Sequence, residues 1–124
     1  MRILKTIMIA LTMMFVMIIT PINAQKQLVK KTVVTEAIGF KQFSATAYCL
    51  QGKTASGIRT RPGIVAADPR VLKLGSTIEI LGIGSFLVAD VGGGIKNNKI
   101  DIWMSGCNNA RKFGRKIVLI KKIK

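Results

Sequence analysis

Short apolar or alternating runs, broken by glycine and proline, make up most of the chain after Lys41. Such runs are typical of strands, because successive side chains of a strand point to opposite sides. The runs that predict strands cover residues 43–49, 64–67, 77–81, 85–90, 99–104 and 115–123. In the last run, Ile117 and Leu119 share one face. Residues 105–113 predict a helix that Ser105 caps and Gly114 ends, and residues 71–74 predict a helical turn. Six short strands with one or two short helices predict a mainly β fold, a small closed barrel.

The first 24 residues have the order of a secretory signal peptide. Charged residues up to Lys5 are followed by an uncharged, mainly apolar stretch from Thr6 to Ile19 and by Ala24 before the expected cleavage point. That stretch is shorter than the roughly 20 residues that cross a bilayer. We therefore expect export to the periplasm, the cell wall or the medium, with an uncleaved membrane anchor as the alternative. Residues 25–40 are expected to be a linker or edge segment, and residues 41–124 the barrel domain.

The charge and the absence of histidine exclude several classes of function. The chain has no histidine, which removes Ser-His-Asp and Cys-His catalytic sites and histidine-containing zinc sites, so we expect no metal and no cofactor. Its 20 Lys and Arg residues against 5 Asp and Glu residues give a formal net charge of +15. A surface of one sign attracts anionic polymers. For an exported protein these are cell-wall polymers. No base-reading motif or row of aromatic residues points to nucleic acid, and we expect a monomer.

The predicted export determines how the two cysteines are interpreted. In an oxidising compartment, Cys49 and Cys107 are candidates for a disulfide, whereas two buried free thiols are the alternative. Closing so long a loop is worth about 4 kcal/mol in chain entropy.

Three aspartates, Asp68, Asp90 and Asp101, stand where predicted strands meet turns. Each of them alone is typical of a turn residue. Asp101 differs, because it interrupts an apolar string and strands disfavour aspartate. Strand ends converge at the rim of a barrel, so the three carboxylates are candidates for one site. The glycines after Asp90, which include Gly92 and Gly93, allow the backbone to approach a ligand closely.

The segment from Asp90 to Asp101 reads Asp-Val-Gly-Gly-Gly-Ile-Lys-Asn-Asn-Lys-Ile-Asp. It resembles the signature of the 3D domain family, named for three aspartates, and the matching segment of membrane-bound lytic transglycosylase A. Thr-Ala-Tyr, Thr-Ala-Ser-Gly and Ile-Val-Ala-Ala-Asp-Pro precede it in the order of the family. The resemblance covers roughly Phe43 to Lys122. Two positions depart from the pattern: Gly94 replaces the usual alanine, and Asn97 replaces the usual glycine.

The resemblance implies a double-psi β-barrel that cleaves peptidoglycan glycan strands at the MurNAc–GlcNAc bond. It implies that Asp101 is the general acid/base and that Asp90 assists, while Asp68 is either a third site member or a cap that holds a loop. Such a mechanism needs a protonated Asp101, and burial beside Trp103 together with the Asp90 charge is expected to raise its pKa. Trp103 itself is expected in the core, with stacking on a sugar ring as the alternative.

The substrate contacts and the activity both have alternatives. Lys96, Thr54 and Tyr48 are candidates for contact with the substrate, and a structural role is equally open for Thr54 and Tyr48. The full-length transglycosylases use a second domain to form the substrate groove, and this chain has no room for one. The alternative function is therefore a non-catalytic cell-wall polysaccharide-binding module of expansin-like type.

Overall fold

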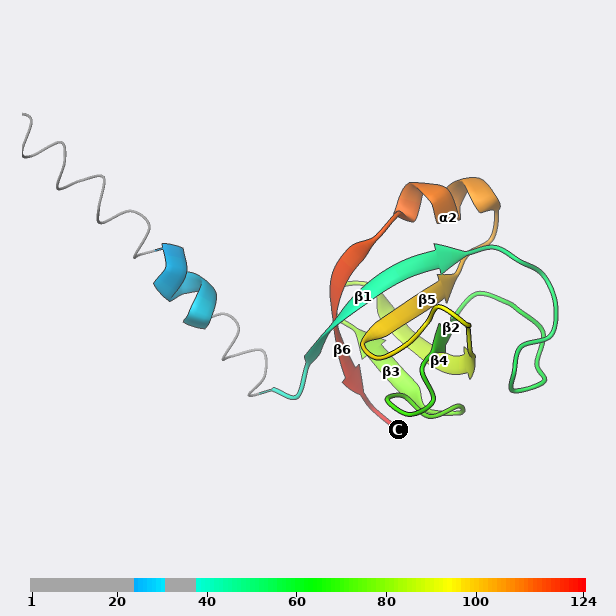
Figure 1. Ribbon diagram of the computed structural model, residues 1–124, viewed down its shortest axis with the longest axis horizontal. Coiled ribbons are helices and arrows are strands. Elements are labelled where there is room, and N and C mark those ends of the chain that lie inside the picture. Colours follow the sequence, from blue (N-terminus) through cyan, green and yellow to red (C-terminus); the bar gives the residue numbers. More distant parts are fainter. Residues whose placement is uncertain (1–23, 31–37) are drawn as a thin grey trace, which may run out of the picture. The chain divides into compact units, whose positions relative to one another are not determined.

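The structure, a computed structural model, describes residues 24–30 and 38–124. Residues 24–30 form a helix, which includes the first six residues of the segment predicted to be a linker or edge segment. The predicted signal peptide lies, apart from Ala24, outside the described residues. A separate compact unit extends from Gly39 to Lys124 (Figure 1). Among the described residues, no helix combines the length and the apolar character needed to cross a membrane.

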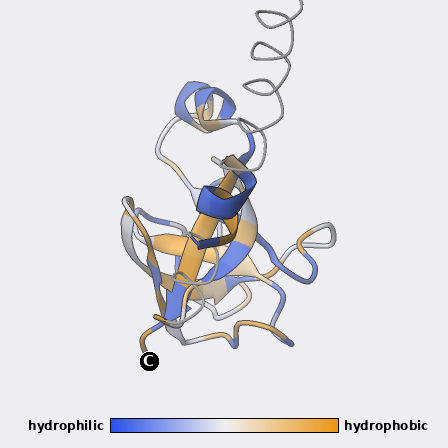
Figure 2. Cartoon of the chain, turned by 90° about the vertical axis from the view of Figure 1, so that its left-hand side faces the viewer, coloured by the Kyte–Doolittle hydropathy of each residue, from blue (hydrophilic) through white to orange (hydrophobic). Residues whose placement is uncertain are grey.

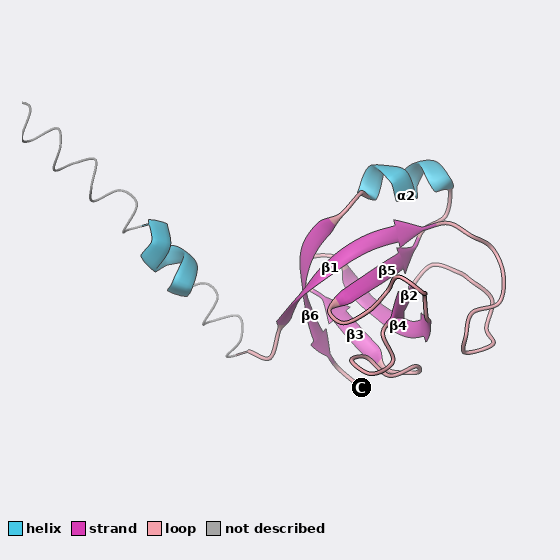
Figure 3. Cartoon of the chain, in the orientation of Figure 1, coloured by secondary structure: helices cyan, strands magenta, loops and turns pink. Residues whose placement is uncertain are grey.

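Six strands form a closed barrel in this unit (Figure 3). They are β1 (Lys41–Tyr48), β2 (Ile64–Ala67), β3 (Thr77–Ile80), β4 (Gly84–Asp90), β5 (Lys99–Trp103) and β6 (Lys116–Lys122). Their order around the barrel is β1-β5-β2-β4-β3-β6. The β1–β5 and β2–β4 pairs are parallel, and the other four pairs are antiparallel. The predicted mainly β, six-stranded barrel is therefore confirmed.

Alternate residues of the strands fill the barrel interior. Many are β-branched, which suits a strand because such side chains pack well on a pleated surface. The fully or almost fully buried interior residues are Phe43, Ala45, Val65, Ala67, Ile78, Ile80, Val88, Ile100, Ile102, Val118 and Ile120. Figure 2 shows hydrophobic residues, in orange, mainly in the strands. In β6 the buried residues are Val118 and Ile120, so the face shared by Ile117 and Leu119 is the outer one.

The helix α2 (Cys107–Phe113) starts later than the sequence predicts. Its N-cap is Gly106 with φ 83°, and it has no side-chain cap, so the prediction of Ser105 as the cap is wrong. The positive φ explains the difference, because glycine adopts it without the strain that a side chain causes. Gly114 is the C-cap, as predicted.

The predicted helical turn at residues 71–74 lies earlier in the structure, where residues 68–72 form one hydrogen-bonded turn that does not continue into a longer helix. The N–H groups of Val71 and Leu72 both donate to the Asp68 carbonyl, 2.9 Å away. The chain then reverses at Gly75, where φ is 85°. Asp68, which directly follows β2, thus begins the turn of residues 68–72.

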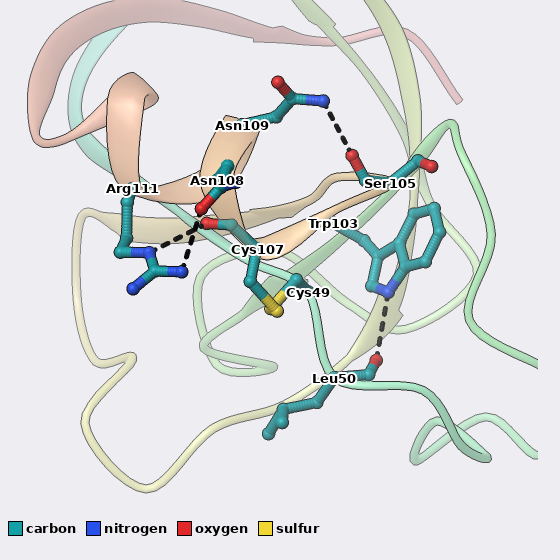
Figure 4. Close-up of a disulfide and its surroundings, with 8 residues drawn as sticks. All are labelled: Cys49, Leu50, Trp103, Ser105, Cys107, Asn108, Asn109 and Arg111. Carbon is teal, nitrogen blue, oxygen red and sulfur yellow. Dashed lines mark hydrogen bonds between the residues drawn. A yellow bond between two sulfur atoms is a disulfide. The ribbon is translucent and has the colours of Figure 1, made fainter.

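A disulfide joins the end of β1 to the start of α2. Cys49 and Cys107 are bonded, with 58 residues of sequence separation and 5.1 Å between their Cα atoms (Figure 4). Beside it, the indole N–H of Trp103 donates to the Leu50 carbonyl at 3.0 Å. Trp103 is only 7% exposed, so it belongs to the core. The disulfide and the indole together hold the chain as it leaves β1.

Candidate functional site

Two of the three aspartates lie in one row across the barrel wall. Asp101 on β5 pairs with Thr46 on one side and with Ala66 of β2 on the other. Ala66 in turn pairs with Asp90 of β4, next to a register shift in β2. Because Ile100 lies inside the barrel, the side chain of Asp101 points outward. The main chains at Asp101 and Asp90 are thus separated by two strand spacings, about 10 Å.

Asp90 holds the loop of residues 50–63 against the barrel. Its Oδ1 accepts hydrogen bonds from the N–H groups of Ala55, at 3.0 Å, and Val91, at 2.9 Å. Its Oδ2 accepts a hydrogen bond from the Tyr48 hydroxyl at 3.1 Å. A second link between loop and barrel is the hydrogen bond from the Ser56 N–H to the Ala89 carbonyl. Both carboxylate oxygens of Asp90 are therefore engaged within the fold.

Asp101 has a different environment. The Thr46 hydroxyl donates to Asp101 Oδ1 at 2.9 Å, and no hydrogen bond to Oδ2 occurs among the described residues. Burial raises the pKa of the Asp101 carboxyl, and the Thr46 hydrogen bond opposes that rise. Burial is therefore the cause of the raised pKa, and the expected contribution of the Asp90 charge is not among its causes. A raised pKa is what a carboxyl group needs to donate a proton near neutral pH.

Tyr48 contacts Asp90 and lies close enough to Asp101 for the charge of Asp101 to act on its hydroxyl. Burial raises the pKa of its hydroxyl, and so do the hydrogen bond to Asp90 and the charges of Asp90 and Asp101. Its ring packs on a second hydrophobic cluster on the outer side of the barrel wall. This cluster consists of Ile64, Ala89 and Trp103, with Tyr48, Ile58 and Leu87 packed against them. The site thus has an apolar floor, which weakens solvent screening of its charges.

Asp68 has a structural environment. Arg70 donates to it from its main-chain N–H at 3.0 Å and forms an ion pair with Oδ2 at 2.7 Å. The Asn97 N–H donates to Oδ2 at 2.9 Å. These hydrogen bonds hold the pKa of Asp68 well below its usual range. Asn97 has a φ of 55°, a conformation that asparagine tolerates better than most residues. The geometry favours the role of a cap for the loop between β4 and β5.

The other candidate residues are placed as follows. Thr54 is buried, and its hydroxyl donates to the Ile58 carbonyl at 3.1 Å, which favours a structural role inside the loop. Lys96 is exposed and forms no ion pair within the described part of the chain. A Cβ on Gly92 would lie 2.8 Å from Ile95 Cγ1, whereas one on Gly93 would meet open space. Within residues 24–30 and 38–124, no group of three or more acidic, Cys or His side chains could hold a metal ion.

Thr46, the hydrogen-bond partner of Asp101, was not among the predicted site residues. The signal was present, because the alternation in β1 puts Thr46 and Tyr48 on the same face. What the sequence lacks is the register of β1 against β5, which sets Thr46 opposite Asp101.

A family model described as the 3D domain matches residues 63–124. The chain belongs to the 3D domain family. The match includes Asp68, Asp90 and Asp101, whereas Thr46 and Tyr48 lie before it. The residues that contact the two carboxylates thus come in part from a strand outside the matched segment.

Several curated proteins of Bacillus subtilis (strain 168) are similar to this chain. The cell wall-binding protein YocH is 38% identical over 63% of this chain and 30% of its own length. The putative cell wall shaping protein YabE is 37% identical over 63% of this chain and 21% of its own length. The SPbeta prophage-derived uncharacterized protein YorM is 34% identical over 74% of this chain and 45% of its own length. The chain thus spans less than half of the length of each.

Among solved structures, the crystal structure of MltA from E. coli aligns with a TM-score of 0.49 and 22% sequence identity. The alignment covers 59% of this chain and 27% of that one.

Proposed function

We propose that this protein is exported and cleaves peptidoglycan glycan strands as a lytic transglycosylase. The observation that carries the proposal is the environment of Asp101, an outward-facing carboxyl group that accepts one hydrogen bond, from Thr46, and whose pKa burial raises against the effect of that bond. A strand interior disfavours such a residue, and nothing in the barrel core needs it. Perturbed carboxyl groups of this kind cluster at catalytic sites.

The proposed reaction needs one group that gives a proton and then takes one. Asp101 protonates the glycosidic oxygen of the MurNAc–GlcNAc bond as that bond breaks, and the GlcNAc leaves with a new hydroxyl. The 6-hydroxyl of the MurNAc forms a bond to the anomeric carbon and gives its proton to Asp101, which yields a 1,6-anhydro end. No water is consumed, and Asp101 ends in its starting protonation state.

Asp90 and Tyr48 assist this reaction in the proposal. The ionised Asp90 fixes Tyr48 and the loop of residues 50–63, and its charge favours the positive charge that develops at the anomeric carbon. Tyr48, Lys96, Gly92 and Gly93 are the proposed substrate contacts. Asp68 holds the loop that carries Lys96 and is assigned no chemical step.

Two further observations support a cell-wall substrate. The relatives YocH and YabE carry names that refer to cell-wall binding and cell-wall shaping. The formal net charge of +15 complements anionic wall polymers and the carboxylates of peptidoglycan. Export through a signal peptide at residues 1–24 would bring the protein to that substrate.

A non-catalytic wall-binding module is the second candidate function. The engagement of both Asp90 oxygens within the fold favours it, because a carboxylate used to fasten a loop has less freedom to assist a reaction. The printed name of YocH, a cell wall-binding protein, points the same way.

Digestion of purified peptidoglycan separates the two candidates. The wild-type protein is expected to produce 1,6-anhydro ends, detected by mass spectrometry, and Asp101→Asn to slow their formation by about 10²–10⁴-fold. The matched control is Glu79→Gln, which changes an acid on β3 opposite Lys121 and is expected to keep full activity. Circular dichroism checks that both variants fold. Binding to peptidoglycan without anhydro ends would refute the enzyme and support the binding module.

A further inference from the structure

An apolar surface lies on the outside of the barrel where β6 meets β3. We call it the β6 patch, and it consists of Leu81, Ile83, Ile117 and Leu119. Ile117 is 69%, Leu81 51% and Ile83 45% exposed. The four residues are neighbours: Ile117 and Leu119 share the outer face of β6, the Leu81 N–H donates to the Leu119 carbonyl, and Ile83 follows in the same turn. Contiguous apolar surface of this kind marks a site of contact with another phase or molecule.

The surroundings of the β6 patch are strongly basic. Residues 111–124 contain seven Lys and Arg residues and no acid. A further cation, Lys99, lies on the other side of the patch. Ser44 of β1 pairs with Ile117 of β6 and with Lys99 of β5, so these three residues form one row across the strands. The half-buried Glu79, opposite Lys121, is an acidic residue next to the patch. A second copy of this chain is therefore a poor occupant, because like charges would meet.

We propose that the β6 patch docks on an anionic lipid bilayer. Headgroup phosphates attract the basic border, and the four apolar side chains enter the boundary between headgroups and acyl chains. An anionic polymer would satisfy the cations but would leave the apolar side chains in water, so the combination favours lipid. This inference is independent of the proposed enzymatic activity.

The topology gives the docked protein a useful orientation. Around the six-stranded barrel, β6 is three strands away from β2 in either direction. In Figure 1, β6 lies on one side of the barrel and the loop of residues 50–63 on the other. Docking through the β6 patch would therefore leave the loop of residues 50–63 facing away from the bilayer, whereas β5, which carries Asp101, is only two strands from β6.

Tryptophan quenching tests the proposal on the full chain. Ile117→Trp and Leu81→Trp each place a fluorophore in the β6 patch. Leu50→Trp is the matched control, because Leu50 is 75% exposed but lies in the loop of residues 50–63, outside the patch. Vesicles of phosphatidylglycerol with brominated acyl chains quench only a fluorophore that reaches the acyl region. We expect loss of emission for Ile117→Trp and Leu81→Trp, no loss for Leu50→Trp, and weaker binding in high salt. The native Trp103 gives the same background in every variant.

Quenching reports on the position of each introduced tryptophan. Attachment to the vesicle through the apolar N-terminal segment alone would therefore not quench a tryptophan in the β6 patch. Equal quenching of Leu50→Trp, absence of quenching in vesicle-bound Ile117→Trp, or equal quenching with phosphatidylcholine vesicles would overturn the proposal. A final experiment replaces the vesicles with soluble poly(glycerol phosphate), an anionic polymer. An emission change of Ile117→Trp with this polymer, but not with vesicles, would assign the patch to a wall polymer and overturn lipid docking.

Discussion

Removal of the Cys49–Cys107 disulfide is the perturbation whose size follows most directly from the structure. The bridge closes a loop of 58 residues, which removes about 14 cal/mol/K of chain entropy from the unfolded state. At 25 °C this amounts to about 4 kcal/mol, a large part of the roughly 5–15 kcal/mol that stabilises a typical domain. For a domain of this size, each kcal/mol corresponds to about 4–8 °C in Tm. We therefore expect Cys49→Ser/Cys107→Ser to unfold about 15–30 °C lower than the wild-type protein.

Urea denaturation of the double variant measures the free energy of unfolding directly. Both cysteines are at least partly exposed, so the serine hydroxyls meet water and add no burial penalty of their own. The control is Ser105→Ala, which changes the same region and leaves the bridge intact. A loss below about 1 kcal/mol in the double variant, with an unchanged m value, would refute the loop-closure argument.

Two smaller changes test the contacts of the site. Tyr48→Phe removes the hydrogen bond to the half-buried Asp90 and is expected to cost about 1–2 kcal/mol in urea denaturation, and an unchanged midpoint would show that this bond does not stabilise the fold. Gly92→Ala brings a Cβ to 2.8 Å from Ile95 Cγ1 and is expected to cost about 1–3 kcal/mol. Gly93→Ala meets open space and is expected to stay within about 0.5 kcal/mol of the wild type, so equal losses in the two variants would contradict the packing argument.

The strands were predictable because alternation is a local property of the chain. The buried face of each strand was harder to predict from the sequence, and β6 shows why. Its two faces both carry large aliphatic residues, Ile117 with Leu119 and Val118 with Ile120. Only closure of the barrel between β1 and β3 decides that Val118 and Ile120 point inward. The start of α2 was missed for a local reason, since a serine is a good cap but the backbone needed the positive φ of Gly106.

The two carboxylates were found from the sequence, but their relation was not. Asp101 stood out because a charged residue interrupts an apolar strand. Its position in a row with Asp90 depends on Ala66, which pairs with both through a register shift that no local pattern encodes. The same long-range register brings Thr46 to Asp101. Local chemistry therefore identified the acids, and barrel closure determines their partners.

Asp101 and Asp68 make opposite predictions for the dependence of stability on pH. Burial raises the pKa of Asp101 in the folded state, so its stabilising contribution is full below about pH 4 and is lost as pH rises from there through the raised value. The hydrogen bonds from Arg70 and Asn97 lower the pKa of Asp68, so its contribution is present above about pH 4 and is lost as pH falls. Asp101→Asn is therefore expected to raise Tm near neutral pH, and Asp68→Asn to lower it there. Thermal unfolding of both variants across the acid-to-neutral range measures this. An Asp101→Asn protein less stable than the wild type near neutral pH would mean that the ionised carboxylate is stabilised by the fold, and the proposed proton donor would lose its physical basis.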